Sequence, residues 1–230
     1  MKYRNLFFDL DDTIWAFSRN ARDTFEEVYR KYSFERYFDS FDHYYTIYQQ
    51  RNTELWIEYG EGKITKDELN RQRFSYPLQA VGVEDETLAE KFSEDFFAII
   101  PTKSGLMPYA KEVLEYLVPK YNLYILSNGF RELQSRKMRS AGVDIYFKEV
   151  ILSEDLGVLK PWPEIFNFAL SATQSELRES LMIGDSWEAD ITGAHGVGMH
   201  QAFYNVTERT TFPFLPTYHI HSLKELMDLL

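Results

Sequence analysis

The feature that most constrains the fold is a regular alternation of short apolar runs with helical patterns, from about residue 101 to the end of the chain. Four of the runs have the length and composition of buried strands: 121–126, 149–152, 181–183 and 199–204. Helical patterns lie between them, at about 130–141, from 163 onward and through Asp190. Strands that alternate with helices predict a parallel, doubly wound α/β sheet.

The first part of the chain predicts one more strand of this sheet and then a long helical insertion. A short apolar run, 6–8, ends at Asp9 and predicts the first strand. The stretch that follows is aromatic-rich and helical in pattern, with no strong strand signal. We therefore predict an α/β core formed by 1–14 and 102–230, with an all-helical domain at 15–101 inserted after the first strand.

Residues that start helices give more local predictions. Ser18 is expected to cap the first helix, and Pro108 is expected in the first turn of a later one. Pro163 is expected to start the helix that follows it, and Ser222 with Glu225 forms the pattern of a capping box for the terminal helix. These predictions fix helix ends without requiring any tertiary contact.

Polar residues follow several predicted strands, where ligands bind in open parallel sheets. They are Asp9, Asp11 and Thr13 after the first strand, Ser127 and Asn128 after the second, Asp185 after a later one, and Lys160 before a proline-rich turn. A pair of aspartates at a strand end is also an ordinary turn, and a single lysine is usually a solvated surface group. Together, however, they predict one polar site at the rim of the sheet.

Composition excludes some classes of partner. The formal net charge is −11, so the surface repels nucleic acid polymers and anionic membranes, and neither is an expected partner. The chain has no cysteine, which excludes disulfides and thiolate chemistry and fits a cytoplasmic protein. None of the five histidines forms a convincing metal-ligand pattern. Oligomeric state is left open.

This constellation resembles the haloacid dehalogenase superfamily of hydrolases with a helical cap. The residues that carry the resemblance are Asp9, Asp11 and Thr13, then Ser127, then Lys160, then Asp185 with Asp190. The resemblance implies Mg²⁺ bound by the side chains of Asp9 and Asp185 and by the backbone carbonyl of Asp11, with Asp190 close by. A Mg²⁺ ion at this position is chemically reasonable, because converging carboxylates repel one another and Mg²⁺ prefers oxygen ligands.

The implied reaction is transfer of phosphate to Asp9 and then to water. Asp11 would serve as acid and base, Ser127 and Asn128 would hold phosphate oxygens, and Lys160 would supply positive charge. Within the superfamily, the chain resembles bacterial pyrimidine 5′-nucleotidases at Leu55-Trp56 with Tyr59, Gly62–Thr65, Ser127–Phe130 and Ser153–Pro161. This resemblance implies a small phosphorylated metabolite as substrate, namely a pyrimidine deoxyribonucleotide or a noncanonical nucleotide.

Other functions share part of this pattern. A phosphatase of another metabolite, such as a sugar phosphate or phosphoglycolate, and a sugar phosphomutase could use every core motif. A 2-haloacid dehalogenase needs neither a metal nor an acid at position 11, and a non-enzymatic binding module would be expected to lack a catalytic residue. The aromatic residues Tyr44, Tyr45 and Tyr48 have the spacing of a helical core, which we favour over a base-stacking role.

Overall fold

The computed structural model describes residues 2–230, which divide into two compact units. Of these residues, the first unit contains 2–18 and 104–230, and the second contains 19–103. The first is an α/β unit built on a single sheet, and the second is entirely helical. None of the described helices has the length and apolar character needed to cross a membrane.

The sheet of the first unit has six strands, all parallel, in the order β3-β2-β1-β4-β5-β6. The strands are Asn5–Phe8 (β1), Asn122–Ser127 (β2), Glu149–Leu152 (β3), Ser180–Gly184 (β4), His200–Tyr204 (β5) and Tyr218–Ile220 (β6). Because the chain fills β1, β2 and β3 outward and then returns to place β4 on the other side of β1, the strand order reverses beside β1. The predicted doubly wound fold is confirmed.

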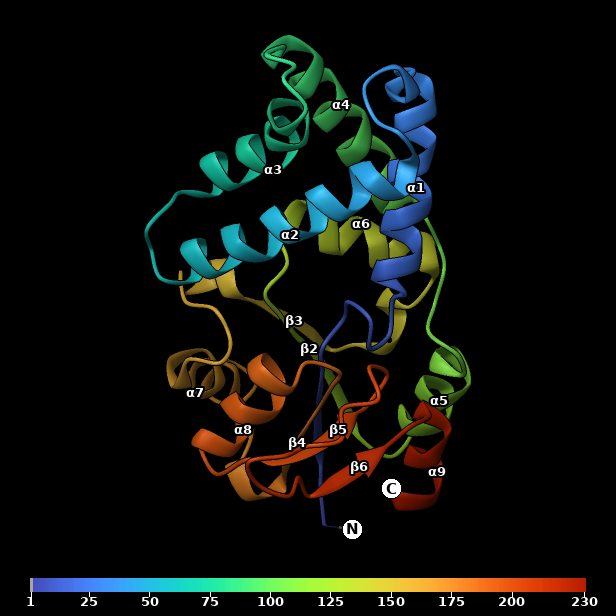
Figure 1. Ribbon diagram of the computed structural model, residues 1–230. Helices are drawn as coiled ribbons and strands as arrows, with labels where there is room; N and C mark the ends of the chain where they lie inside the picture. Colours follow the sequence, from blue (N-terminus) through green and yellow to red (C-terminus); the bar gives the residue numbers. More distant parts are fainter. Residues whose placement is uncertain (1) are drawn as a thin grey trace. The chain divides into compact units, whose positions relative to one another are not determined.

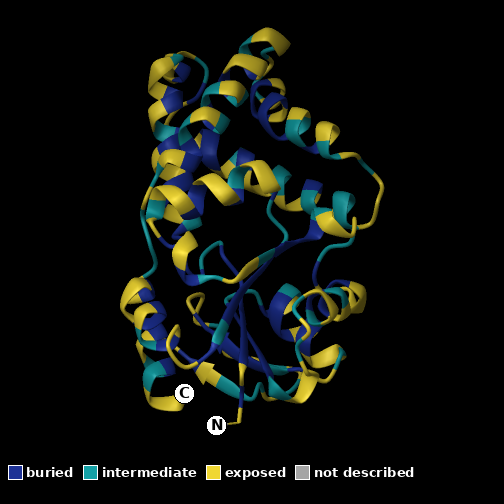
Figure 2. Cartoon of the chain, turned by 180° about the vertical axis from the view of Figure 1, so that it is seen from behind, coloured by how far each residue is buried: buried dark blue, intermediate teal, exposed yellow. Residues whose placement is uncertain are grey.

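Helices cover the sheet of this unit, with α7 and α8 together and α5 and α9 together in Figure 1. The helices are α5 (Ala110–Leu117), α6 (Arg131–Ala141), α7 (Pro163–Ala172), α8 (Thr192–Gly196) and α9 (Leu226–Leu229), with a π-helical turn at Trp187–Ile191 before α8. Alternate strand residues such as Phe7 and Met182 pack against Phe166 of α7. Burial is accordingly greatest along the strands, which are dark blue in Figure 2.

Two segments at the border of the first unit run antiparallel to each other. Trp15 bridges Leu106, Ala16 N–H donates to the Gly105 carbonyl (3.0 Å), and Met107 N–H donates to the Ile14 carbonyl (2.9 Å). The chain therefore leaves the α/β unit and re-enters it at adjacent positions.

The second unit is formed by α1 (Phe17–Lys31), which starts in the first unit, and by α2 (Phe41–Gly60), α3 (Lys66–Ala80) and α4 (Glu86–Ile99). Phe25 is fully buried, and its ring centroid lies 4.2 Å from that of Tyr48 and 4.3 Å from that of Phe96. Tyr44 and Tyr45 are also buried. The core interpretation of the tyrosine cluster is confirmed.

Short 3-10 turns connect the longer elements of both units. They lie at Phe34–Arg36, Ile100–Thr102, Asp144–Tyr146, Ser153–Asp155, Leu177–Glu179 and Leu223–Glu225.

Two of the helix-start predictions are wrong. Ser18 is the second residue of α1 rather than its cap, because the carboxylate of Asp12 accepts hydrogen bonds from Ser18 N–H (2.8 Å) and from Ser18 Oγ (2.6 Å). Pro108 precedes α5 in a turn that Ala110 N–H closes onto the Met107 carbonyl, with Tyr109 at φ +64°. This is the geometry of a type II turn, in which proline is common at the second position, here that of Pro108.

The other two helix-start predictions are confirmed. Pro163 is the first residue of α7. Ser222 with Glu225 forms a capping box at the start of the 3-10 turn Leu223–Glu225, which continues directly into α9. His219 lies in the short strand β6, and His221 lies one residue beyond its end at Ile220.

Candidate active site

The predicted site residues lie where β1, β2 and β4 end side by side. In the register, Phe8 pairs with Ile125 on one side and with Ile183 on the other. Asp9 follows Phe8, and Asp185 follows the end of β4, so the chain delivers both carboxylates to the edge at which the strand order reverses. This is the position at which open α/β sheets bind ligands.

Three carboxylates form the centre of the site. Asp9, Asp185 and Asp190 each have an oxygen within 4.8 Å of the others, and among the described residues they are the one such group of three or more acidic, histidine or cysteine side chains. Thr13 Oγ1 donates to Asp185 Oδ1 (3.0 Å) and accepts from Asp185 N–H (3.1 Å), so it fixes the Asp185 loop.

Asp190 has both of its carboxylate oxygens occupied by donors of the protein. Its Oδ1 accepts from Lys160 Nζ (2.6 Å) and its Oδ2 accepts from Ser186 N–H (3.1 Å). In contrast, no hydrogen bond from a described residue reaches Oδ2 of Asp9 or Oδ2 of Asp185. Asp9 and Asp185 therefore keep oxygens for a cation, whereas Asp190 acts mainly on Lys160.

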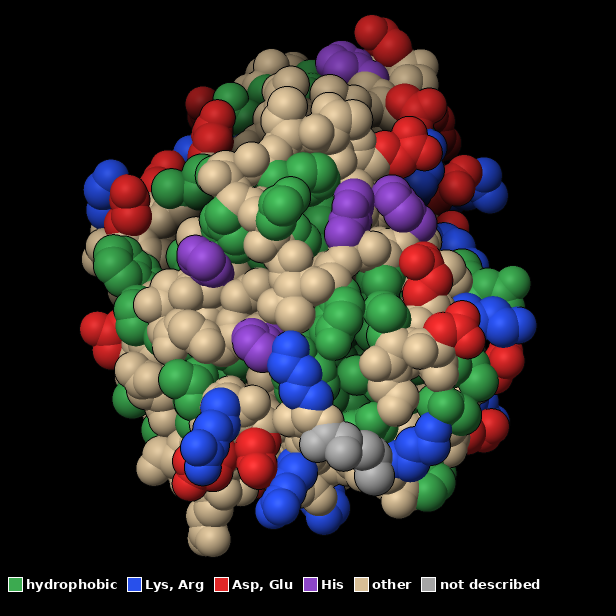
Figure 3. Space-filling view, turned by 90° about the horizontal axis from the view of Figure 1, so that it is seen from below, with side chains coloured by type: hydrophobic (Ala, Val, Ile, Leu, Met, Phe, Trp, Pro, Cys, Tyr) green, Lys and Arg blue, Asp and Glu red, His purple; other side chains and the backbone are tan. Residues whose placement is uncertain are grey.

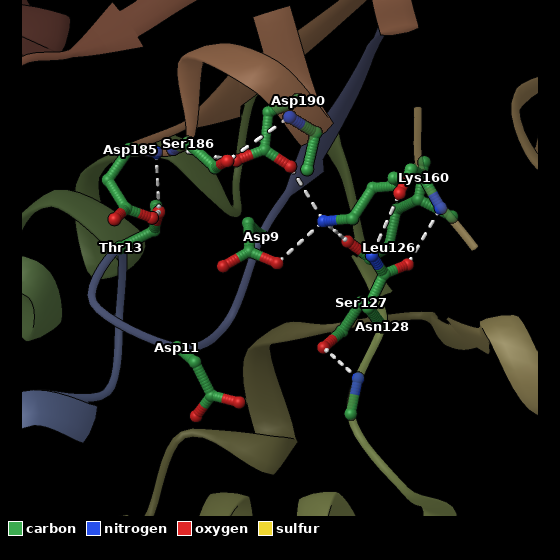
Figure 4. A network of polar contacts seen from close by, with 12 residues as sticks. Asp9, Asp11, Thr13, Leu126, Ser127, Asn128, Lys160, Asp185, Ser186 and Asp190 are labelled. Atoms are coloured by element: carbon green, nitrogen blue, oxygen red, sulfur yellow. Dashed lines mark hydrogen bonds and ion pairs between the residues drawn. The ribbon is translucent and has the colours of Figure 1, made fainter. Parts of the chain in front are cut away.

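Lys160 is the cationic centre of the site. Its ammonium group donates to Asp9 Oδ1 (2.6 Å), to Asp190 Oδ1 (2.6 Å) and to the Leu126 carbonyl (2.7 Å), which uses all three of its protons. Only 2% of the side chain is exposed. Figure 4 shows Lys160 reaching between Asp9 and Asp190 from the opposite side of the site to Thr13.

Burial and neighbouring charges shift the pKa values of the site residues. Burial raises the pKa of Asp9 to about 7, helped by the charges of Asp190 and Asp11 and opposed by Lys160. Burial and then the charge of Asp9 raise the pKa of Asp185 to about 8. Burial alone would lower the pKa of Lys160, but the charges of Asp190 and Asp9 raise it instead.

Ser127 and Asn128 end β2 and hold different partners. Ser127 Oγ accepts from Gly129 N–H (3.1 Å) and from Gln134 Nε2 (2.8 Å), which leaves its own proton for a further acceptor. The Asn128 amide pairs with the backbone of Lys160, donating to its carbonyl (3.0 Å) and accepting from its N–H (2.8 Å). The predicted phosphate contact therefore suits Ser127, while the side chain of Asn128 positions the Lys160 segment.

Asp11 lies outside the group of three carboxylates and faces α6. Lys137 Nζ donates to both of its carboxylate oxygens (2.9 and 3.1 Å), and Gln134 Nε2 donates to Oδ2 (2.9 Å). Sequence reasoning missed Gln134 and Lys137. Their spacing of three residues on the helix after Ser127 was the available signal, since such residues share a face.

The donor set fits Mg²⁺. Asp9 and Asp185 each offer one carboxylate oxygen, Oδ2, to which no described residue donates, and carboxylate oxygens are the ligands that this hard cation prefers. No histidine within residues 2–230 belongs to a group of three or more possible metal ligands. The rings of His219 and His221 contact each other (4.7 Å), and His195 stacks on Phe214 (3.8 Å). Several histidine side chains are visible in purple on the face shown in Figure 3.

Comparisons with known proteins show what this chain is similar to. The family of haloacid dehalogenase-like hydrolases matches residues 3–198. The HAD-hydrolase YfnB of Bacillus subtilis is 33% identical over 100% of this chain and 96% of its own. Two proteins named pyrimidine 5′-nucleotidase, YjjG of Escherichia coli and PynA of Streptococcus pneumoniae, are each 31% identical over 100% of this chain and 99% and 96% of theirs.

A solved structure shows the same similarity in three dimensions. The crystal structure of YfnB bound to magnesium superposes with a TM-score of 0.89 at 29% identity, covering 100% of this chain and 99% of that one.

Proposed function

Since this chain belongs to the haloacid dehalogenase-like hydrolases, as its motifs predict, we propose that it is a magnesium-dependent phosphatase of small phosphorylated metabolites. The observation that carries the proposal is the contact of Asp9 with Lys160 (2.6 Å) inside a group of carboxylates that have oxygens left for a cation. Asp9 and Asp185 would hold Mg²⁺ by their side chains and Asp11 by its backbone carbonyl. When bound, the ion offsets the negative charge of the carboxylates and of the phosphate.

The first step transfers phosphate to the protein. An oxygen of Asp9 attacks phosphorus, and the bond from phosphorus to the leaving oxygen breaks as the new bond forms. Asp11 gives its proton to the leaving oxygen. Lys160 orients the Asp9 carboxylate, and the Ser127 hydroxyl donates to a phosphate oxygen.

The second step returns the phosphate to water. Water attacks the phosphorus of the aspartyl-phosphate, its proton passes to Asp11, and the bond from phosphorus to Asp9 breaks. Inorganic phosphate leaves, Asp9 is regenerated, and Asp11 is again protonated. Asp11 is suited to both steps because 26% of its side chain is exposed, whereas Asp190 has 1% exposed.

The substrate we propose is a pyrimidine or noncanonical nucleoside 5′-monophosphate. This finer proposal rests on the full-length similarity to two proteins named pyrimidine 5′-nucleotidase. A dehalogenase function is disfavoured, because Asp11 and a cation-binding carboxylate group would have no role in it.

The test measures phosphate release from nucleoside 5′-monophosphates, sugar phosphates and p-nitrophenyl phosphate, with and without Mg²⁺, beside chloride release from a 2-haloacid. We expect phosphate release that requires Mg²⁺ and is fastest with pyrimidine nucleotides. Asp9→Asn should abolish turnover while thermal unfolding shows a retained fold. Chloride release, or wild-type turnover in Asp9→Asn, would contradict the proposal.

A further inference from the structure

Two buried polar side chains of α6, Gln134 and Lys137, donate hydrogen bonds to Asp11. Lys137 has 4% of its side chain exposed, and its ammonium group donates to both carboxylate oxygens of Asp11 (2.9 and 3.1 Å). The rings of Trp15 and Phe17 lie over the same ammonium group, with centroids at 4.8 and 5.0 Å. A lysine placed in this way has little rotational freedom, so it fixes the plane of the carboxylate it contacts.

Gln134 connects Asp11 to Ser127. Its Nε2 donates to Asp11 Oδ2 (2.9 Å) and to Ser127 Oγ (2.8 Å), which uses both amide protons. The side chain is fully buried, and its Oε1 has no hydrogen-bond partner among the described residues. The Nε2 atom of Gln134 therefore bridges the Asp11 carboxylate and the Ser127 hydroxyl, while its Oε1 atom is left without a hydrogen bond from a described residue.

Gly129 makes room for this bridge. A Cβ atom at position 129 would overlap the amide nitrogen of Gln134. The absence of a side chain at Gly129 thus leaves room for the Gln134 amide. This observation is independent of the hydrogen bonds.

From these contacts we propose that Gln134 and Lys137 are positioning residues that aim the Asp11 carboxylate at the leaving-group oxygen, at a fixed separation from the phosphate held by Ser127. The inference rests on the proposed phosphatase function. A small displacement of a positioned acid costs a large factor in rate, because the geometry of proton transfer is strict. Neither residue is required to touch the substrate.

A comparison of two leaving groups tests this role. A nucleoside leaves as an alkoxide that needs a proton, whereas p-nitrophenolate leaves without one. In Gln134→Met and Lys137→Met, which keep side-chain length but remove the donors, kcat/KM for a pyrimidine 5′-monophosphate should fall on the order of 10²-fold. For p-nitrophenyl phosphate the fall should be only a few-fold. Lys137→Arg, which keeps charge and donors, should restore most of the nucleotide activity.

Further variants control for folding. Arg139→Met, on an exposed position of α6, should leave both activities unchanged. Gly129→Ala should reproduce the leaving-group effect by displacing the Gln134 amide, and it serves as the test if Gln134→Met does not fold. Equal losses for both esters, or no loss for either, would overturn the inference while leaving the phosphatase function standing. A wild-type enzyme that hydrolyses neither ester would overturn both.

Discussion

Lys160 illustrates how single residues determine this site. It is a buried charge, and burial of a charge is tolerated only when partners compensate for it. Two carboxylates and a carbonyl do so at 2.6–2.7 Å. The position of Lys160 therefore depends on Asp190, whose carboxylate lies against the Cα of Gly184 so closely that a Cβ there would overlap it.

The close contact at Gly184 gives a prediction about activity. Gly184→Ala should displace the Asp190 carboxylate and, with it, Lys160, lowering kcat/KM on the order of 10²-fold. The matched control is Gly196→Ala, since a Cβ at Gly196 meets no atom within 4 Å. Steady-state kinetics with p-nitrophenyl phosphate measure both variants. Equal activities in the two would show that Asp190 does not set the position of Lys160.

Asp11 gives a second prediction at this scale. Asp11→Asn keeps the shape and the backbone carbonyl of the residue, so Mg²⁺ binding should be retained, as measured by calorimetry. Loss of the proton donor should reduce kcat for a nucleotide by about 10²–10⁴-fold. A variant that turns over at the wild-type rate would remove Asp11 from its assigned role.

At the scale of elements, α1 begins where Asp12 reaches forward to Ser18. Asp12 has φ +58°, a conformation that aspartate and asparagine tolerate better than most residues. Its carboxylate accepts from both the N–H and the hydroxyl of Ser18. Asp12 therefore accepts a hydrogen bond from a backbone N–H in the first turn of α1, although it lies six residues before Ser18 and is not adjacent to the helix.

This capping contact predicts a loss of stability. Asp12→Ala should destabilise the protein by about 1 kcal/mol, the typical cost of losing a helix cap. For a chain of this size, that corresponds to a fall in Tm of about 2–4 °C. Asp12→Asn, which keeps an acceptor and tolerates positive φ, should lose less. Differential scanning calorimetry measures both, and equal Tm values for wild type and Asp12→Ala would contradict the assignment.

Sequence reasoning succeeded where elements obey local rules. Strands and the polar residues that follow them were predictable, because apolar runs and strand ends are visible in the sequence. Ser18 and Pro108 were misplaced because Asp12 and the turn at Met107–Ala110 compete with them through contacts that a local pattern does not contain. Gln134 and Lys137 were missed because polar residues on a helix usually face solvent, and only the fold shows that these two are buried.

For the whole molecule, the site links stability to pH. The folded-state pKa values of Asp9 and Asp185 are about 7 and about 8, whereas an unfolded aspartate has a pKa of about 4. Between these values the folded protein binds more protons than the unfolded chain. The free energy of unfolding of the metal-free protein should therefore fall as pH rises from about 4 to about 8.

Magnesium should reverse that loss. Mg²⁺ competes with protons for the same carboxylates, so the rise in Tm on adding Mg²⁺ should be larger near pH 8 than near pH 5. In Asp185→Asn the metal-free protein should lose less stability with rising pH, and the effect of Mg²⁺ should be largely lost. Thermal unfolding across this range measures both. A metal effect that does not change with pH would contradict the assignment.

The antiparallel pairing of 14–16 with 105–107 has a consequence for how such molecules diversify. The segment between these two stretches starts and ends at neighbouring positions. Its length and sequence can therefore vary without displacing the strands of the sheet. A different helical segment could therefore replace the present one between residues 16 and 105, in evolution or by design, while the active-site residues of the α/β unit are kept.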